Sequence, residues 1–154
     1  MKIQDGSARL DEARELIAEY AARLNRDLSF QNLEAELSDL AGKYTPPAGE
    51  LLVAVDETNA VVGMVAYHRH SAERCEMKRL YVKPEARGSR LGDRLVGEIL
   101  RHARKAGYRE MVLDTIAPLR AAVALYRKWG FSECAPYYDN PMDDVIYLSK
   151  KLSD

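Results

Sequence analysis

The sequence predicts an α/β (α+β) fold, with a mixed β-sheet flanked by about four helices. Three observations support this prediction. Apolar residues recur at helical spacing in the first third, and β-rich runs alternate with turn signals in the middle third. The last third alternates helix, strand, helix and strand patterns. Because 154 residues is the length of one ordinary domain, we expect residues 1–154 to form a single domain.

Two helices are predicted in the first third, after a short strand near Ile3. Ser7 is a suitable N-cap for a helix whose apolar residues then repeat at helical spacing. A second helix is predicted from near Ser29 to Gly42, since a glycine can end a helix. Residues 43–50, with two prolines and a glycine, separate these helices from the strands that follow.

The middle third predicts three strands. Residues 51–70, LLVAVDETNAVVGMVAYHRH, contain two β-rich runs around the turn-forming DETN, which indicates a hairpin. A third strand is expected from about Arg74 to Val82. It stops at Pro84, which cannot donate a hydrogen bond to a neighbouring strand.

The last third predicts two helices and two strands. The first helix ends at Gly107 and buries one stripe of residues: Leu91, Leu95, Ile99 and Ala103. Residues 110–115, EMVLDT, are typical of a short buried strand. The second helix ends at Gly130 and carries a further stripe: Ala122, Leu125, Tyr126 and Trp129. Residues 145–152, VIYLSKKL, form the last predicted strand.

Composition and charge exclude several classes of function. Hydrophobic residues make up 47% and charged residues 31%, as in an ordinary globular protein. The formal net charge of -1 gives the chain as a whole no attraction to nucleic acid or to an anionic membrane. No apolar run reaches ~18 residues, and the first residues lack the apolar segment of a secretion signal. We therefore expect a cytoplasmic protein with no nucleic-acid or membrane partner.

The turn before the first helix of the last third reads RGSRLG, residues 87–92. The first turn of a helix has unpaired N–H groups and a partial positive charge, and glycine lets a ligand approach them closely. Arg87 and Arg90 could add charge-assisted hydrogen bonds. This pattern suits the phosphate groups of a cofactor, although a solvated loop between strand and helix would fit the same residues. Neither G-x-x-x-x-G-K-[ST] nor G-x-G-x-x-G occurs.

Two segments together, EMKRLYVKPEARGSRLGDRLVGEIL and AAVALYRKWGF, resemble the GNAT superfamily of acetyl-CoA-dependent N-acetyltransferases. The resemblance covers roughly residues 51–151. The family's acyl-CoA motif, [Q/R]-x-x-G-x-[G/A], falls on six residues: Arg87, Gly88, Ser89, Arg90, Leu91 and Gly92. Arg90 stands where glycine is usual. The family's LYxxxGF motif matches residues 125–131 without change, whereas Leu119 stands where asparagine is often found.

The resemblance implies a GNAT-like, mostly antiparallel sheet that is splayed to make a slot for acetyl-CoA. The backbone of Leu80, Tyr81 and Val82 would pair with the pantetheine arm, and the N–H groups of residues 88–92 would bind the pyrophosphate. Backbone N–H groups of residues 80–82 would also stabilise the negative charge that develops on the thioester oxygen. No metal is implied. Dimers are common in the family, which leaves a homodimer open.

Two side chains are predicted to move protons. An alkyl amine has a pKa near 10.4, so deprotonating it at pH 7 costs roughly 4–5 kcal/mol, more than protonating a thiolate requires. By the resemblance, Glu76 aligns with the general base and Tyr126 with the general acid at the cofactor sulfur. Two alternatives remain open. Glu76 could be a strand carboxylate paired with Lys78 or Arg79, and Tyr126 could be a core tyrosine.

Other polar residues have weaker signals. His68 and His70 share one face of a strand, but no third metal ligand has matching spacing, which favours a surface position or a base relay. Asp114 could line the acceptor site, or it could accept a hydrogen bond from a loop or a helix N-terminus. Three residues of the loop 135–144 could shape a pocket for a cationic acceptor or simply form turns: Tyr137, Tyr138 and Asp139.

These observations predict a function. We expect the transfer of an acetyl group from acetyl-CoA to a primary amine of a small molecule, by direct attack in a ternary complex. A first alternative is acetylation of a protein lysine or N-terminus. A second, from another class, is a non-catalytic domain that binds acyl-CoA and regulates a partner.

Overall fold

The structure is a computed structural model in which residues 1–26 and 32–153 are described. The strands are β1 (Lys2–Asp5), β2 (Gly49–Val55), β3 (Val61–Arg69), β4 (Arg74–Val82), β5 (Glu110–Ile116), β6 (Ser132–Glu133) and β7 (Val145–Lys151). The helices are α1 (Leu10–Leu24), α2 (Leu33–Ser38), α3 (Leu40–Tyr44), α4 (Leu91–Lys105) and α5 (Arg120–Lys128). A short 3-10 turn, η2 (Pro84–Ala86), follows β4.

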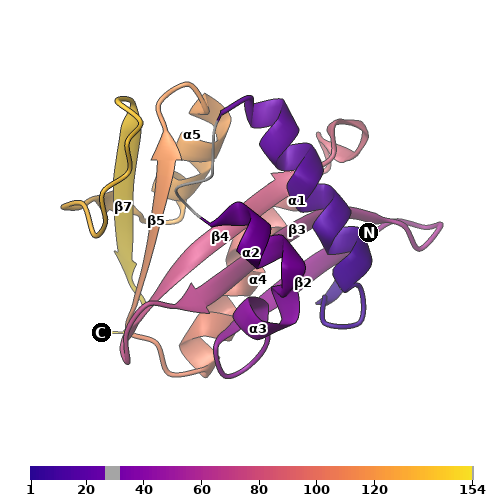
Figure 1. The fold of residues 1–154 in the computed structure, drawn as a ribbon, viewed down its shortest axis with the longest axis horizontal. Coiled ribbons are helices and arrows are strands. Elements are labelled where there is room, and N and C mark those ends of the chain that lie inside the picture. Colours follow the sequence, from indigo (N-terminus) through magenta and orange to yellow (C-terminus); the bar gives the residue numbers. More distant parts are fainter. Residues whose placement is uncertain (27–31, 154) are drawn as a thin grey trace.

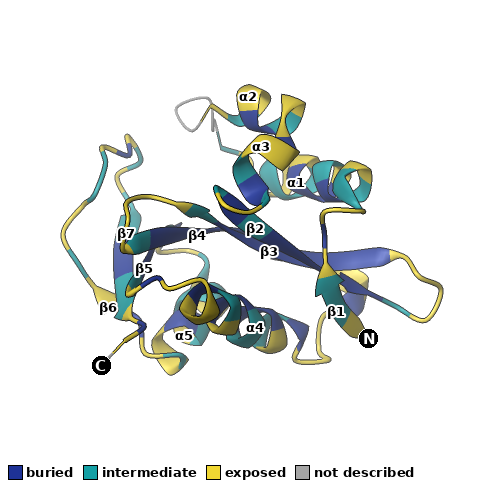
Figure 2. Cartoon of the chain, turned by 90° about the horizontal axis from the view of Figure 1, so that it is seen from below, coloured by how far each residue is buried: buried dark blue, intermediate teal, exposed yellow. Residues whose placement is uncertain are grey.

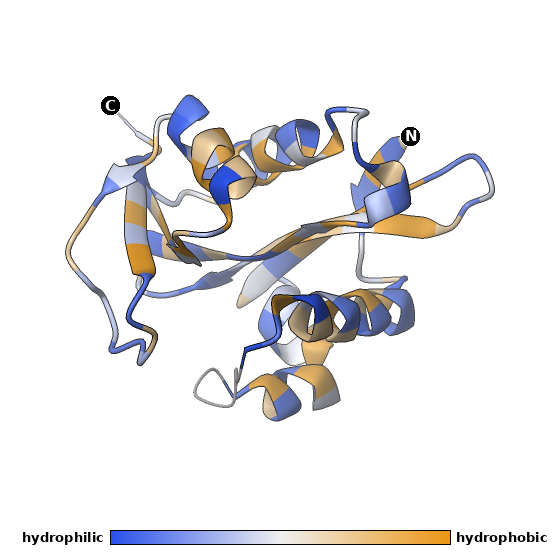
Figure 3. Cartoon of the chain, turned by 90° about the horizontal axis from the view of Figure 1, so that it is seen from above, coloured by the Kyte–Doolittle hydropathy of each residue, from blue (hydrophilic) through white to orange (hydrophobic). Residues whose placement is uncertain are grey.

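The elements form three layers, with one central sheet between two layers of helices (Figure 1). The strand order is β1-β2-β3-β4-β5-β7-β6. Helices α1, α2 and α3 cover one face of this sheet, and α4 and α5 cover the other (Figure 2). Apolar residues of the helices face the sheet from both sides, while their polar residues face outward (Figure 3). The predicted mixed sheet is thus confirmed, with five α-helices among the described residues where about four were expected.

Two apolar cores hold the layers together. The core beneath α4 includes Leu95 and Ile99 of that helix and Met77 of β4. The core beneath α1 and α3 includes Ile17 and Leu40. Both cores follow from the predicted periodicities, since helices contribute every third or fourth residue and strands every second. In the part of the chain that the structure describes, no helix is long and apolar enough to cross a membrane.

The start of the first helix was predicted wrongly. Ser7 does not cap it, because the Ser7 N–H donates to Oδ1 of Asp5 (2.8 Å) and the chain then turns. The N–H of Arg9 donates to the carbonyl of Gly6 (2.9 Å), which closes that turn before α1 begins at Leu10. The short aspartate side chain stabilises the turn locally, a common alternative to helix for such residues.

The second predicted helix is broken in two. Gly42 was expected to end it, but Gly42 lies inside α3, and its N–H donates to Oδ1 of Asp39 (3.0 Å). Asp39 has a non-helical backbone and is the N-cap of α3, so α2 ends at Ser38. An aspartate in this position competes with the helix backbone and favours a new helix start. The predicted start near Ser29 falls outside the described residues.

The sheet is splayed between β4 and β5. These two strands are parallel and pair over only three positions, Arg74 with Glu110, Cys75 with Met111 and Glu76 with Val112. Beyond these positions the β4 edge from Met77 to Val82 has no strand partner on the β5 side in the described register. The rest of the sheet, from β1 to β4 and from β5 to β6, pairs antiparallel. The splay predicted from the resemblance is confirmed.

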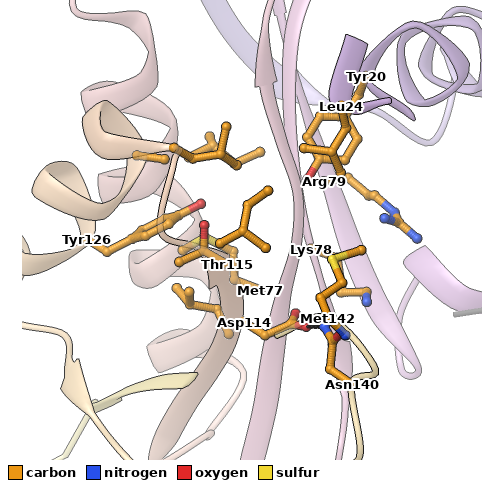
Figure 4. A pocket seen from close by; sticks show the side chains of 15 residues that line it. Tyr20, Leu24, Met77, Lys78, Arg79, Asp114, Thr115, Tyr126, Asn140 and Met142 are labelled. Atoms are coloured by element: carbon orange, nitrogen blue, oxygen red, sulfur yellow. Dashed lines mark hydrogen bonds between the residues drawn. The ribbon is translucent and has the colours of Figure 1, made fainter. Parts of the chain in front are cut away.

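A β-bulge lies in β4 beside the splay. The register with β3 shifts between Met64 and Ala66, and Arg79 has a positive φ of 61°. The extra residue changes the alternation of side chains along the strand. As a result, Lys78 and Arg79 both lie on the side of the sheet that α1 and α2 cover, across the strand from Tyr126 (Figure 4). The bulge thereby places two cations on one side of the splay.

Candidate active site

The loop between η2 and α4 has the geometry of an anion-binding site. Gly88 has φ 93° and Arg90 has φ 59°, so the backbone is left-handed at two positions out of three. Among the described residues, the N–H groups of residues 88–92 donate no hydrogen bond. A Cβ added at Gly88 would meet nothing within 4 Å, so the backbone there is open to a ligand. Unpaired N–H groups at a helix N-terminus are a favourable site for phosphate.

Arg90, which stands where the family usually has glycine, adopts a backbone conformation that favours glycine. It is the N-cap residue of α4, and its left-handed backbone is one that glycine adopts without a steric penalty. An L-residue there costs about 1–2 kcal/mol. Arg87 does not reach over the loop, because its Nε donates to the carbonyl of Val82 (3.2 Å). The backbone N–H groups of the loop are therefore open to an anion.

A narrow pocket passes through the splay between β4 and β5 (Figure 4). On the α5 side it is lined by Tyr126, Ala122 and Leu119. On the opposite side it reaches Lys78, Asp114 and residues of α1. The full lining is Tyr20, Leu24, Met77, Lys78, Arg79, Leu80, Leu113, Asp114, Thr115, Ile116, Leu119, Ala122, Tyr126, Asn140 and Met142. We call this pocket the slot. It connects the two faces of the sheet.

The three predicted pantetheine-binding residues sit at the unpaired edge of β4. Leu80 lines the slot, and its side chain packs with the core beneath α4. Val82 packs on the same side. Tyr81 faces the other way, where its ring packs edge-on against Tyr20 (5.8 Å between centroids) and its hydroxyl donates to Oε2 of Glu19 (2.5 Å). The side chains thus anchor the strand while its backbone edge faces the slot.

Tyr126 points its hydroxyl into the slot (Figure 4). The residue is buried, and its ring packs edge-on against Phe131 of the LYxxxGF motif (6.0 Å between centroids). The hydroxyl makes no hydrogen bond to any residue that the structure describes. Burial, and then the nearby Tyr20 and Asp114, raise the pKa of Tyr126 above its ordinary value. The hydroxyl therefore stays protonated near neutral pH and is available as a donor.

Glu76 lies on the opposite face of the sheet from Tyr126 and is almost fully buried. Its Oε1 is 2.7 Å from Nε2 of His68, and its Oε2 accepts a hydrogen bond from the hydroxyl of Tyr137 (2.5 Å). Burial alone would raise its pKa, but the hydrogen bond from His68, the charge of Lys78 and the hydrogen bond from Tyr137 lower the pKa of Glu76 to about 2. The carboxylate is thus firmly ionised and held on both oxygens.

The cation pairs around Glu76 differ from those suggested by the sequence. Lys78 approaches Glu76 only at the limit of an ion pair, with 4.0 Å between Nζ and Oε2. Arg79 instead pairs with Glu36 of α2, with 2.8 Å between Nε and Oε2. Lys43 shares the same carboxylate, with Nζ 2.8 Å from Oε1. The two cations hold the pKa of Glu36 at about 2 although burial opposes them. No local pattern in the sequence signals this pair, because its partners are 43 residues apart.

Asp114 is both a slot residue and a loop anchor, so the structure combines the two roles left open for it. Its Oδ2 accepts hydrogen bonds from the hydroxyl of Tyr138 and from Nδ2 of Asn140 (2.8 Å for the latter). The hydroxyl of Tyr147 in turn donates to the carbonyl of Tyr138 (2.9 Å). These bonds fix the loop 135–144 against β5 and β7. Asp139 is exposed and lines neither the slot nor the neighbouring groove.

A second cavity, which we call the groove, adjoins the slot at Lys78. It is lined by Asn32, Lys43, His68, His70, Glu76, Lys78, Tyr137 and Tyr138. Both histidines line the groove, but His70 lies one residue beyond the end of β3 and not on the strand as predicted; its ring packs edge-on against Tyr137 (5.4 Å between centroids). Among the described residues, no three acidic, histidine or cysteine side chains gather closely enough to hold a metal ion. His68 instead binds Glu76, in the position of a relay.

Comparison with known proteins identifies the family. Residues 11–131 match the sequence profile of the acetyltransferase (GNAT) family. The chain belongs to this family. It is 46% identical over 145 residues to an uncharacterized N-acetyltransferase of Schizosaccharomyces pombe, which covers 94% of this chain and 89% of the relative. The protein is therefore an N-acetyltransferase of the GNAT family.

Solved structures agree with this fold. An acetyltransferase of the GNAT family from Staphylococcus aureus Mu50 superposes with a TM-score of 0.82 over 99% of both chains, at 18% identity. An aminoglycoside 6'-N-acetyltransferase solved in complex with coenzyme A superposes with a TM-score of 0.75 over 100% of this chain and 98% of that one, at 15% identity. At such low identity these likenesses concern the GNAT fold and not the acceptor.

Proposed function

We propose that this GNAT enzyme transfers the acetyl group of acetyl-CoA to a primary amine of a small molecule, by direct attack in a ternary complex. The observation that carries the proposal is the slot through the splayed sheet. It is lined by Tyr126 on one side of the sheet and by Lys78 and Asp114 on the other. Two substrates entering from opposite faces can therefore meet at the unpaired edge of β4. That arrangement favours direct transfer.

The residues present fit acetyl-CoA as the cosubstrate. The N–H groups of residues 88–92 would hold its diphosphate, because they are unpaired within the described chain and Gly88 leaves the approach open. The unpaired β4 edge at Leu80 and Val82 would bind the pantetheine arm. When bound, acetyl-CoA supplies an activated acetyl thioester. The coenzyme A named for the aminoglycoside 6'-N-acetyltransferase supports this assignment by analogy.

Tyr126 serves the leaving group in this proposal. Its raised pKa keeps the hydroxyl protonated, so it can donate a hydrogen bond or a proton to a sulfur that gains negative charge. In the β4 segment 80–82, backbone N–H groups on the edge that β5 leaves unpaired would stabilise charge on the carbonyl oxygen. Such preorganised donors contribute roughly 3–4 kcal/mol in enzymes where they have been removed.

Glu76 acts through His68 rather than by accepting the proton itself. With a pKa of about 2, the carboxylate would be a poor match for a base near neutral pH. It can instead hold the His68 ring through the 2.7 Å contact to Nε2 and leave the other ring nitrogen for the amine or an intervening water. A carboxylate that orients an imidazole base is a recurring arrangement in enzymes.

The acceptor side favours a small molecule over a protein. On the acceptor side the slot is lined by Tyr20 and Leu24 of α1, and the loop that Asp114 anchors through Tyr138 and Asn140 lies beside it. A folded protein surface would have to displace this loop, whereas a small amine would not.

A screen for released coenzyme A thiol tests the proposal directly. Acetyl-CoA is mixed with the enzyme and with separate panels of amino acids, polyamines, aminoglycosides and basic peptides. Saturable thiol release with a small amine supports the proposal. Release only with peptides would favour a protein acetyltransferase, and tight acetyl-CoA binding without any release would favour a regulatory acyl-CoA-binding domain.

A further inference from the structure

Lys78 is a buried cation whose ammonium group donates no hydrogen bond to the described residues of the protein. Its side chain is 9% exposed. An ammonium carries three N–H donors, yet no acceptor within hydrogen-bond distance of Nζ is found among residues 1–26 and 32–153. The closest carboxylate oxygen, Oε2 of Glu76, is 4.0 Å away. Buried charges are normally paired and hydrogen-bonded, so this one is positioned for a group that the protein does not supply.

The neighbouring carboxylates already have partners. Glu76 is bound through both oxygens by His68 and Tyr137. Glu36 holds Arg79 and Lys43, so two cations already share one carboxylate there. Asp114 also lines the slot beside Lys78, and its Oδ2 accepts hydrogen bonds from Tyr138 and Asn140. Among the described residues, no carboxylate oxygen lies within hydrogen-bond distance of Nζ, so Lys78 can bind an acceptor oxygen of a ligand.

Lys78 also stands where the two cavities meet. It lines both the slot and the groove, and among the described residues it is the one that the two linings share. The groove contains two ammonium groups, those of Lys43 and Lys78, and one carboxylate, that of Glu76. Lys43 is paired with Glu36, so Lys78 is the groove cation that an anionic group of an acceptor can approach before it reaches the slot. An anionic group is favoured there over a cationic one.

We propose that the acceptor is an amino acid, whose carboxylate binds Lys78 while its amine enters the slot. This inference rests on the proposed acetyl transfer and names its substrate class. Lys78 precedes Leu80 by two positions in β4, a distance of roughly 6–7 Å along a strand. The amine of an α-amino acid is separated from its carboxylate by a single carbon. A carboxylate hydrogen-bonded to Lys78 therefore places the amine close to the strand segment that faces the thioester.

The proposal differs from an expectation drawn from the sequence. The loop 135–144 offered an acidic and aromatic surface for a cationic acceptor, but Asp139 is exposed and outside both cavities. The loop tyrosines that do line the groove, Tyr137 and Tyr138, donate their hydroxyls to Glu76 and Asp114. The two tyrosines therefore stabilise carboxylates through hydrogen bonds and present no negative charge of their own to a ligand.

Matched pairs of acceptors test the proposal on the wild-type enzyme. Thiol release is measured with alanine, leucine and phenylalanine, and with the carboxamide of each, which keeps the amine and removes the anion. Losing the carboxylate lowers the amine pKa and makes the carboxamide the better nucleophile near neutral pH, so intrinsic reactivity works against the acid. We expect kcat/KM for the acids to exceed that for the amides by about 10- to 100-fold, the effect of hydrogen bonds to a charged group.

A variant assigns the preference to Lys78. Lys78→Met keeps the length of the side chain and removes its charge, and we expect the acid-to-amide ratio of kcat/KM to fall to within about threefold of one. Lys105→Met, at the exposed end of α4, is the matched control and should keep the wild-type ratio. Calorimetric titration of alanine into the wild-type and Lys78→Met enzymes, each saturated with coenzyme A, measures the same contact without turnover. If Lys78→Met does not fold, the comparison of acids with amides on the wild-type enzyme still tests whether the acceptor needs a carboxylate.

The outcomes separate this inference from the proposed function. Amides that react as well as the acids, or an unchanged ratio in Lys78→Met, would overturn the carboxylate assignment while acetyl transfer stands. No thiol release with any amine of the wider panel would overturn acetyl transfer itself, and this inference with it.

Discussion

Nε2 of His68 lies 2.7 Å from Oε1 of Glu76, and the two residues face each other directly across the antiparallel pair β3–β4. The hydroxyl of Tyr137 donates a hydrogen bond to the other carboxylate oxygen, Oε2. The carboxylate therefore has a fixed orientation and fixes the imidazole in turn. This geometry makes His68, with Glu76 behind it, the proton acceptor in our account.

The first prediction concerns this pair. His68→Gln and Glu76→Gln should each lower kcat by about 10²-fold or more, the usual contribution of a general base. The double variant should be little slower than either single one, because the two residues act as a unit. Steady-state kinetics near neutral pH measures both effects.

His102→Gln is the control for this prediction, since His102 contacts Glu50 through Nδ1 (2.7 Å) and lines neither the slot nor the groove. It should keep wild-type kinetics. Fully additive losses in the double variant, or a His68→Gln enzyme with wild-type turnover, would contradict the relay and return Glu76 to the position of a direct base.

The second prediction concerns Tyr126. Tyr126→Phe should lower kcat by about 10²-fold, because the leaving sulfur loses its donor, while the affinity for acetyl-CoA stays within about twofold of wild type. Steady-state kinetics gives the first value and calorimetry the second. Tyr108→Phe, another buried tyrosine that packs against Tyr67, is the matched control and should change neither. Unchanged turnover in Tyr126→Phe would make it a core tyrosine only.

The third prediction concerns backbone strain at Arg90. Glycine at this left-handed position relieves about 1–2 kcal/mol of strain and adds roughly 0.5–1 kcal/mol of unfolded-state entropy. Arg90→Gly should therefore raise the free energy of unfolding by up to about 1 kcal/mol. Arg104→Gly, in the last turn of α4, should lower it by about 1 kcal/mol. Chemical denaturation measures the free energy of unfolding of both variants. A similar decrease in both would contradict the claim that the backbone is strained at Arg90.

The fourth prediction concerns stability in acid. The pKa of Glu36 is lowered to about 2 in the folded protein, so its ion pairs stabilise the fold fully above the ordinary glutamate range. This stabilisation is lost as the pH falls from about 5 towards 2, and it amounts to about 3 kcal/mol. Glu36→Gln should be less stable at pH 7, because Arg79 loses this ion pair, and should show a flatter pH dependence in this window. Denaturation at pH 7, 5 and 3 measures both, and an unchanged slope would contradict the assignment.

Much of the fold could be predicted because it follows from local periodicity. The hairpin of β2 and β3, the strand from Arg74 to Val82 and the helix after the RGSRLG turn each bury one regular face, and the structure confirms them. The two-residue strand β6 was missed, since two residues carry no period. The break at Asp39 was missed because a single cap outweighed a continuous apolar stripe.

The site could be predicted only in part. The backbone loop at residues 88–92 and the LYxxxGF helix are contiguous in sequence, so their composition is visible there. The ion pair of Glu36 with Arg79 joins segments 43 residues apart and depends on a bulge, which leaves no local signal. The contact of His68 with Glu76 has a weaker signal, since a hairpin places nearby strand residues opposite each other.

The central claim is that the N–H groups opening α4 hold the diphosphate of acetyl-CoA, and calorimetric titration tests it most directly. The account predicts saturable heat with one acetyl-CoA per chain for the wild-type protein. It also predicts affinity at least about tenfold weaker for Gly88→Val, where φ is 93° and a side chain would strain the loop. No heat of binding in the wild type, or equal affinity in the two proteins, would contradict it.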